Sequence, residues 1–171
     1  KAGVIVKNRF CKPSSSKYNQ YINYMDRPEA VRTEHTMEYD LYADYMGNPE
    51  KTTGLFTAEK NRLTEAESKE MKKRFAAAQE KGSLMWQTVI SFDNSWLKEN
   101  GLLHDGILDE KKIYEVTRKG MRKMLQKEGL ENAIWSGSIH YNTDNIHIHV
   151  ATVEPDPMRK VKEYQEYEWK E

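Results

Sequence analysis

Three of the five histidines in this chain, His140, His147 and His149, fall within ten residues of one another. A neutral imidazole is a ligand for divalent metal ions, and three such ligands leave positions open for water or a substrate oxygen, as in catalytic metal sites. The alternative is three unrelated polar side chains on a solvated surface. His35 and His104 lie outside this group, and we expect both to be surface residues.

The three histidines can share an ion only if the backbone brings them to one face. Residues 133–140 and 146–153 read as two strands that flank the turn-forming segment 141–145, so the pattern predicts a β-hairpin. Side chains alternate along a strand, which places His147 and His149 on one face and the apolar residues between them on the other. In a symmetric hairpin, His140 lies opposite His147, and such partners have Cβ atoms about 4.5–5.5 Å apart.

The turn of the predicted hairpin contains Asn142, Asp144 and Asn145. These side chains could orient the histidines through hydrogen bonds, as groups behind metal ligands commonly do. The preference of Asn and Asp for turns explains the same residues equally well.

Tyr18, Tyr21 and Tyr24 recur at intervals of three after a predicted strand, Ala2–Phe10. We expect a short helix here that ends near Asp26. A phenol with a pKa of about 10 is a poor nucleophile, but it can attack phosphorus when a cation neutralises the phosphate oxygens. Ordinary core or surface aromatics are the alternative.

The remaining pattern predicts helices alternating with strands. Thr64 and Glu67 have the spacing of a capping box, and Asp109 is a suitable N-cap for a second helix. The order of elements indicates an α+β fold in which helices cover an antiparallel sheet. The expected segments are a helix from Thr64 to Lys81, a strand at Leu84–Phe92, a connection from Asp93 to Leu108, a helix from Asp109 to Gly129, irregular chain over 28–62 with a weak strand signal at Met37–Tyr45, and a helical tail at Met158–Glu171.

Length and composition favour one soluble domain, which we expect to be cytoplasmic, without a signal peptide or membrane insertion. Cys11 is the only cysteine, which excludes an internal disulfide and a thiolate zinc site. A net charge of zero argues weakly against a general nucleic-acid binder. Residues 1–33, however, carry seven basic and two acidic side chains, so a local basic patch and a plainly solvated surface both remain open.

The segment from Ile139 to Val150 resembles the third motif of MobP-type relaxases, which belong to the HUH endonuclease superfamily and mobilise plasmids and integrative elements. The motif is His-x-Asp-x-x-Asn-x-His-x-His, and the chain reads His-Tyr-Asn-Thr-Asp-Asn-Ile-His-Ile-His from His140 to His149. It departs at Asn142, where the family has Asp, which removes a charge beside the ligands. Most of the chain, from the first strand to the hairpin, takes part in the resemblance.

The family's nucleophile is a tyrosine in a short helix after the first strand. The segment Tyr18–Met25 is similar in placement, and the matching position is Tyr24, with Tyr21 and Tyr18 as further candidates. A tyrosine that precedes the histidines is typical of relaxases, whereas in rolling-circle replication initiators it follows them.

The resemblance implies an HUH relaxase-like fold, with about five antiparallel strands flanked by helices and the histidines on central strands. Residues 1–171 would form a single catalytic domain of a longer protein. The implied reaction is Mg²⁺- or Mn²⁺-dependent nicking and rejoining of single-stranded or hairpin DNA at an origin of transfer, through a covalent 5′-phosphotyrosine, with accessory mobilisation proteins as partners. Basic and aromatic side chains would hold the DNA, with Arg9, Lys12, Arg27 and Trp135 as candidates.

Three alternatives remain open. A replication initiator or transposase would use Tyr164 or Tyr167, after the histidines. A metal-dependent nuclease would use water and leave no protein joined to DNA. A non-enzymatic module with a structural metal would bind DNA without cutting it.

Overall fold

The structure, a computed structural model, describes residues 2–25, 53–141 and 145–158. Within these ranges, five strands form one sheet in the order β1-β3-β7-β6-β2, and every neighbouring pair is antiparallel. The predicted α+β class and five-stranded antiparallel sheet are therefore confirmed. The strands are β1 (Val4–Cys11), β2 (Leu55–Thr57), β3 (Met85–Phe92), β6 (Ile134–His140) and β7 (Ile146–Val153).

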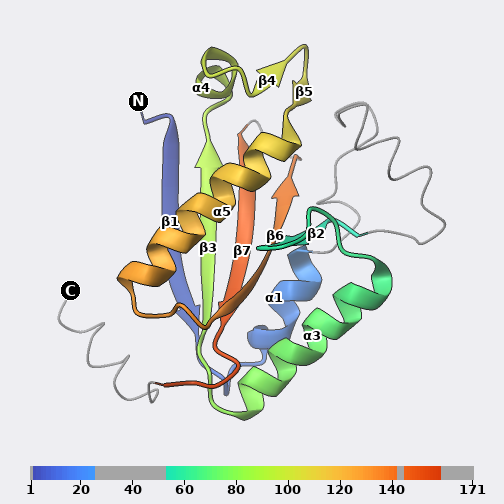
Figure 1. The fold of residues 1–171 in the computed structure, drawn as a ribbon, viewed down its shortest axis with the longest axis vertical. Coiled ribbons are helices and arrows are strands. Elements are labelled where there is room, and N and C mark those ends of the chain that lie inside the picture. Colours follow the sequence, from blue (N-terminus) through green and yellow to red (C-terminus); the bar gives the residue numbers. More distant parts are fainter. Residues whose placement is uncertain (1, 26–52, 142–144, 159–171) are drawn as a thin grey trace.

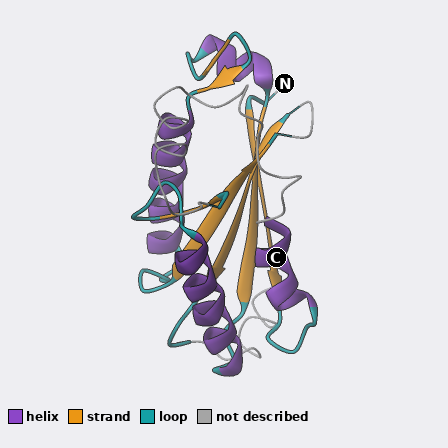
Figure 2. Cartoon of the chain, turned by 90° about the vertical axis from the view of Figure 1, so that its right-hand side faces the viewer, coloured by secondary structure: helices purple, strands orange, loops and turns teal. Residues whose placement is uncertain are grey.

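Helices cover both faces of this sheet. α5 (Glu110–Lys127) crosses one face, and α1 (Lys17–Met25) lies on the opposite face with α3 (Glu65–Glu80) beside it (Figures 1 and 2). The sheet therefore has an α5 face and an α1 face. β7 is the middle strand, so residues near its centre have neighbours on both sides.

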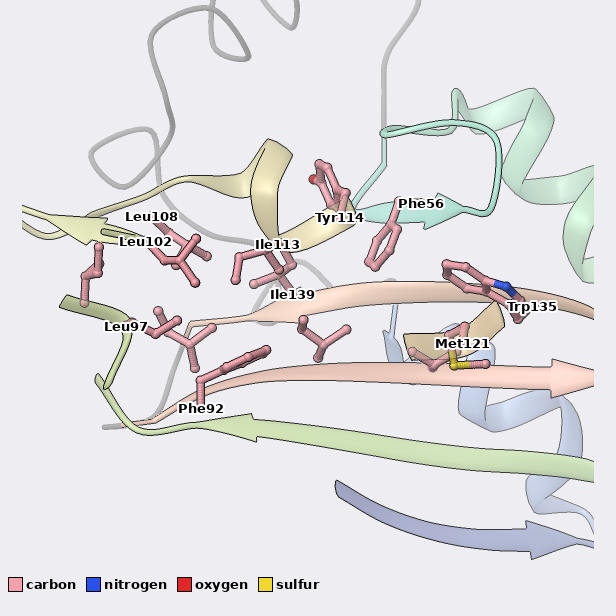
Figure 3. Packing of buried hydrophobic residues seen from close by; sticks show 14 of the residues in the cluster. Phe56, Phe92, Leu97, Leu102, Leu108, Ile113, Tyr114, Met121, Trp135 and Ile139 are labelled. Atoms are coloured by element: carbon pink, nitrogen blue, oxygen red, sulfur yellow. The ribbon is translucent and has the colours of Figure 1, made fainter. Parts of the chain in front are cut away.

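The α5 face carries the larger apolar cluster. Ile113 and Met121 of α5 pack against Ile139, Ile148 and other sheet residues (Figure 3). The side chain of Asp109 accepts a hydrogen bond from the backbone N–H of Lys112, which confirms the predicted N-cap.

The α1 face has its own apolar cluster at one end. Ile22 and Met25 of α1 pack with Phe75 of α3 and with Met85 and Val153 of the sheet. The predicted capping box of α3 is present: the side chain of its N-cap threonine accepts from the N–H of Glu67, whose carboxylate accepts from the threonine N–H. These contacts fix α1 over the sheet.

Two segments in which we predicted no helix or strand, apart from a weak strand signal, contain short elements among their described residues. β2 lies within residues 28–62 and pairs with β6, and the predicted connection contains α4 (Asn94–Glu99) and the hairpin of β4 (Leu103–His104) and β5 (Ile107–Leu108). Strands of two or three residues are too short to show a periodic pattern, and the partner of β2 is distant in sequence. The predictions for Met37–Tyr45, His35 and most of the Met158–Glu171 tail lie outside the described residues.

None of the helices that the structure describes is long and apolar enough to cross a membrane.

Candidate active site

The histidine hairpin has the predicted register. His140 pairs with His147 across β6 and β7, and Ser138 pairs with His149. Between the two β7 histidines, Ile148 is fully buried in the α5-face cluster, so both histidines point to the α1 face. The ring centroids of His140 and His149 are 4.1 Å apart, and those of His147 and His149 are 6.5 Å apart. The three imidazoles thus form one cluster.

Helix α1 places two tyrosines on this cluster. The ring centroid of Tyr24 lies 5.6 Å from that of His140 and 5.7 Å from that of His149. The hydroxyl oxygen of Tyr21 lies 3.1 Å from Nδ1 of His149. Tyr18 is fully buried in the apolar cluster beneath α1, and burial raises its pKa to about 12, so it is removed from the candidate nucleophiles.

Burial sets the charge of the central groups. Burial, followed by the charges of the neighbouring His140, His147 and Arg9, lowers the pKa of His149 from 6.5 to about 4. His149 is therefore neutral at pH 7, as a metal ligand must be. Burial also raises the pKa of Tyr21 well above its usual value, although the positive charge of Arg9 opposes this.

Two residues that the sequence prediction missed hold His140 in place. The hydroxyl of Ser138, on the same face of β6, lies 3.0 Å from Nε2 of His140 and is buried. The hydroxyl of Tyr141, the next residue after His140, donates to the buried carboxylate of Glu110 at the start of α5. The first contact fixes the ring and the second fixes the end of the strand.

An open groove of about 590 Å³ runs from β1 to α1 and contains Tyr21 and Tyr24 in its lining. Arg9 and Lys12, both predicted to contact DNA, also line it, together with Lys17, which the prediction did not include. The groove therefore combines positive charge with exposed aromatic rings. Its remaining lining residues are Phe10, Cys11, Ser14, Ser15, Gln20 and Gln87.

A family model described as MobL relaxases matches residues 1–170. The chain belongs to the MobL relaxases. No curated protein and no solved structure matches it. The predicted relaxase is confirmed at this level, and membership of the family gives the chain a DNA-nicking role in mobilisation with DNA as its partner.

The remaining predicted DNA contacts of this relaxase do not all reach the groove. Trp135 is 5% exposed and packs against Phe56 on the α5 face, so it cannot stack on a base, and this prediction is wrong (Figure 3). Arg27, like Asn142 and Asp144 of the hairpin turn, lies outside the described residues. Asn145 is described and exposed, and His104 is exposed as predicted.

The three histidines of the relaxase are ligands of a type that divalent metal ions bind, and they share one face of the sheet. Two imidazole ligands at about 2.1 Å from one ion would have ring centroids roughly 5 Å apart, whereas the observed separations are 4.1 and 6.5 Å. As the side chains stand, no group of three His, Cys, Asp or Glu residues in the described ranges is arranged to hold a metal ion. Because the three residues already share one face of adjacent strands, convergence requires rotation of side chains rather than movement of the sheet.

Proposed function

We propose that this relaxase cuts and rejoins one DNA strand at an origin of transfer by transesterification at Tyr24, as in the HUH endonucleases and the MobP type that its third motif resembles. One observation carries the proposal: the ring of Tyr24 lies against both His140 and His149 at a groove lined by basic residues. A nucleophile, a set of metal ligands and a surface for a polyanion thus meet in one place.

The exposure of the tyrosines supports Tyr24 as the nucleophile. It is 37% exposed, whereas Tyr18 is fully buried. Tyr21 is partly buried and its hydroxyl is within hydrogen-bonding distance of His149. A scissile phosphate in the groove can reach the hydroxyl of an exposed phenol without displacing core residues, which favours Tyr24 as the catalytic residue.

The proposed step conserves the number of phosphodiester bonds. The phenol oxygen of Tyr24 forms a bond to phosphorus, the bond from phosphorus to the 3′ oxygen breaks, and the proton lost by the phenol is balanced by one gained at that oxygen. The products are a 5′-phosphotyrosine and a 3′-hydroxyl, and the reverse attack rejoins the strand. No external energy source is needed.

His140, His147 and His149 would hold the ion, Mg²⁺ or Mn²⁺, which when bound supplies positive charge to the phosphate oxygens. Burial keeps His149 neutral, which is the state in which an imidazole can bind a metal ion. Arg9, Lys12 and Lys17 would hold flanking phosphates in the groove, an interaction that positions DNA without selecting its sequence.

The test is to incubate the protein with end-labelled single-stranded origin DNA and Mn²⁺, and to look for an adduct that survives denaturant. We expect the adduct in the wild type, its loss in Tyr24→Phe, and its retention in Tyr18→Phe, a matched control on the core side of the same helix. Peptide mapping of the adduct should identify Tyr24.

The alternatives give different results in this assay. Cleavage without an adduct indicates a water nucleophile. Binding without cleavage indicates a DNA-binding module with a structural metal. An adduct at Tyr164 or Tyr167, which lie outside the described residues, indicates the arrangement of replication initiators.

A further inference from the structure

The contact between Tyr21 and His149 joins α1, the helix that carries the proposed nucleophile, to the histidine cluster. The phenol oxygen of Tyr21 lies 3.1 Å from Nδ1 of His149, a hydrogen-bonding distance. The two residues are 128 positions apart in sequence, and α1 brings them together. The ring of Tyr21 also stacks on that of Tyr24, with centroids 6.3 Å apart. Tyr21 therefore contacts both the proposed nucleophile and a proposed ligand.

A neutral imidazole carries one proton, so the partner of one ring nitrogen decides the state of the other. If the phenol donates to Nδ1, the proton of His149 is on Nε2, and neither nitrogen has a lone pair for a cation. If Nδ1 instead carries the proton and donates to the phenol oxygen, Nε2 keeps its lone pair. A phenol oxygen can accept as well as donate, so the geometry allows both arrangements.

We propose that Tyr21 is a positioning residue that holds His149 with its proton on Nδ1, so that Nε2 is the nitrogen offered to the metal ion. This inference rests on the proposed function, because only metal binding by His149 requires the Nε2 lone pair. Ligand histidines usually donate their second ring N–H to a fixed acceptor, and loss of that acceptor weakens metal binding. Here a phenol takes the place of the more usual carboxylate or carbonyl acceptor.

The assignment separates the roles of two neighbouring tyrosines on one helix. Tyr24 reacts with the phosphate, whereas Tyr21 acts through His149 and forms no bond to DNA. In water the neutral side chain of histidine carries its proton mostly on Nε2, so the Nδ1–H form in the folded protein would be a preference that the Tyr21 hydroxyl imposes. Tyr21→Phe removes only the oxygen and keeps the stacked ring.

The first test needs neither metal nor activity. Long-range ¹H–¹⁵N correlation spectra of ¹⁵N-histidine-labelled, metal-free protein at pH 7.5 report which ring nitrogen is protonated, and His149→Asn assigns the signal. We expect the Nδ1–H form in the wild type and the Nε2–H form in Tyr21→Phe. The Nε2–H form in the wild type would overturn the inference without any variant being needed.

The second test measures Mn²⁺ binding by electron paramagnetic resonance. Tyr21→Phe should weaken Mn²⁺ binding roughly 10- to 100-fold, the usual cost of losing a partner behind a ligand, and should still form the adduct on Tyr24 once Mn²⁺ is saturating. Tyr24→Phe should bind Mn²⁺ as the wild type does and form no adduct. Unchanged tautomer and Mn²⁺ affinity in Tyr21→Phe, or an adduct mapped to Tyr21, contradict the inference.

The two proposals can fail separately. If the wild type forms no adduct with any origin DNA, the transesterification proposal fails, while the spectra still decide which nitrogen of His149 carries the proton. If the adduct forms on Tyr24 but the tautomer is Nε2–H, the positioning role of Tyr21 fails and the transesterification stands.

Discussion

The ring of Tyr24 lies 5.6 Å, between centroids, from the ring of His140, although the two residues belong to a helix near one end of the described chain and a strand near the other. The contact exists only because α1 is docked on the sheet. The contacts that hold α1 there are apolar. Ile22, two residues before Tyr24, is buried with Met25 in the cluster shared with α3. The position of Tyr24, the proposed nucleophile, should therefore depend on residues of this buried apolar cluster.

Ile22→Ala should lower the rate of adduct formation more than its loss of stability explains. Removing a buried isoleucine side chain costs about 2–5 kcal/mol, and here the cavity opens under the helix that carries Tyr24. Ile113→Ala is the matched control, since Ile113 is equally buried but lies in the α5-face cluster. The rates should be compared at a temperature where urea titrations show both variants to be folded. Equal rates in the two would mean that α1 docking does not limit the reaction.

Mn²⁺-dependent activity should be lost when a histidine of the cluster is replaced, but not when a histidine elsewhere in the chain is replaced. His147→Ala should weaken Mn²⁺ binding and adduct formation together, whereas His104→Ala, at an exposed residue of the small β4-β5 hairpin, should change neither. Treatment with a chelator should abolish the adduct, and added Mn²⁺ should restore it. Full activity of chelated protein would refute the cation requirement.

The metal-free protein should lose stability as the pH falls from about 6.5 to about 4. The pKa of His149 is lowered from 6.5 to about 4 in the folded chain, so within that window the unfolded state binds more protons and is favoured. Above the window the imidazole is neutral in both states, and below it the imidazole is protonated in both. Urea midpoints at pH 7.5 and pH 5 measure the effect, and His149→Asn should reduce the difference between them. An undiminished difference in that variant would place the effect elsewhere.

Arg9 and Lys12 should contribute to DNA binding through charge. Arg9→Gln and Lys12→Gln should each weaken binding of single-stranded DNA regardless of sequence and reduce the slope of log affinity against log salt by about 0.7. Lys123→Gln, on an exposed position of α5 across the sheet, is the control and should leave the slope unchanged. Fluorescence anisotropy at several salt concentrations gives these slopes. A sequence-selective loss would point to base contacts instead.

Trp135→Ala should destabilise the fold by about 3–5 kcal/mol, as expected for a large aromatic residue removed from a core, because Trp135 packs against Phe56 beneath α5. The DNA affinity of the folded fraction should be unchanged. Thermal denaturation and anisotropy on the same sample separate the two effects. Weaker DNA binding without loss of stability would contradict this and indicate that Trp135 contacts DNA.

The histidine pairing could be predicted from the sequence because a hairpin is local and its side chains alternate with a period of two. His140 does lie opposite His147. The same alternation also determines which face of β6 each of its other side chains occupies. Trp135 is five residues from His140 and so lies on the opposite face of β6, whereas Ser138, two residues away, shares the face of His140 and contacts its ring.

The roles of the tyrosines could not be derived in this way. A step of three residues turns an α-helix by about 300°, so successive tyrosines of α1 are rotated by roughly 60° and move from the core at Tyr18 to the groove at Tyr24. Which of them faces the histidines depends on how α1 docks, and that is decided by contacts with α3 and the sheet. The contact between the Tyr21 hydroxyl and Nδ1 of His149 could not be predicted from the sequence for the same reason.

The alternation along β7 separates two kinds of constraint at single-residue spacing. Ile146, Ile148 and Val150 are in the α5-face cluster, and His147 and His149 between them belong to the site. In a survey of all single substitutions across residues 146–150, losses of cellular abundance and losses of mobilisation frequency should therefore alternate from one position to the next. Within this stretch of one strand, selection for folding and selection for DNA transfer therefore act on different residues.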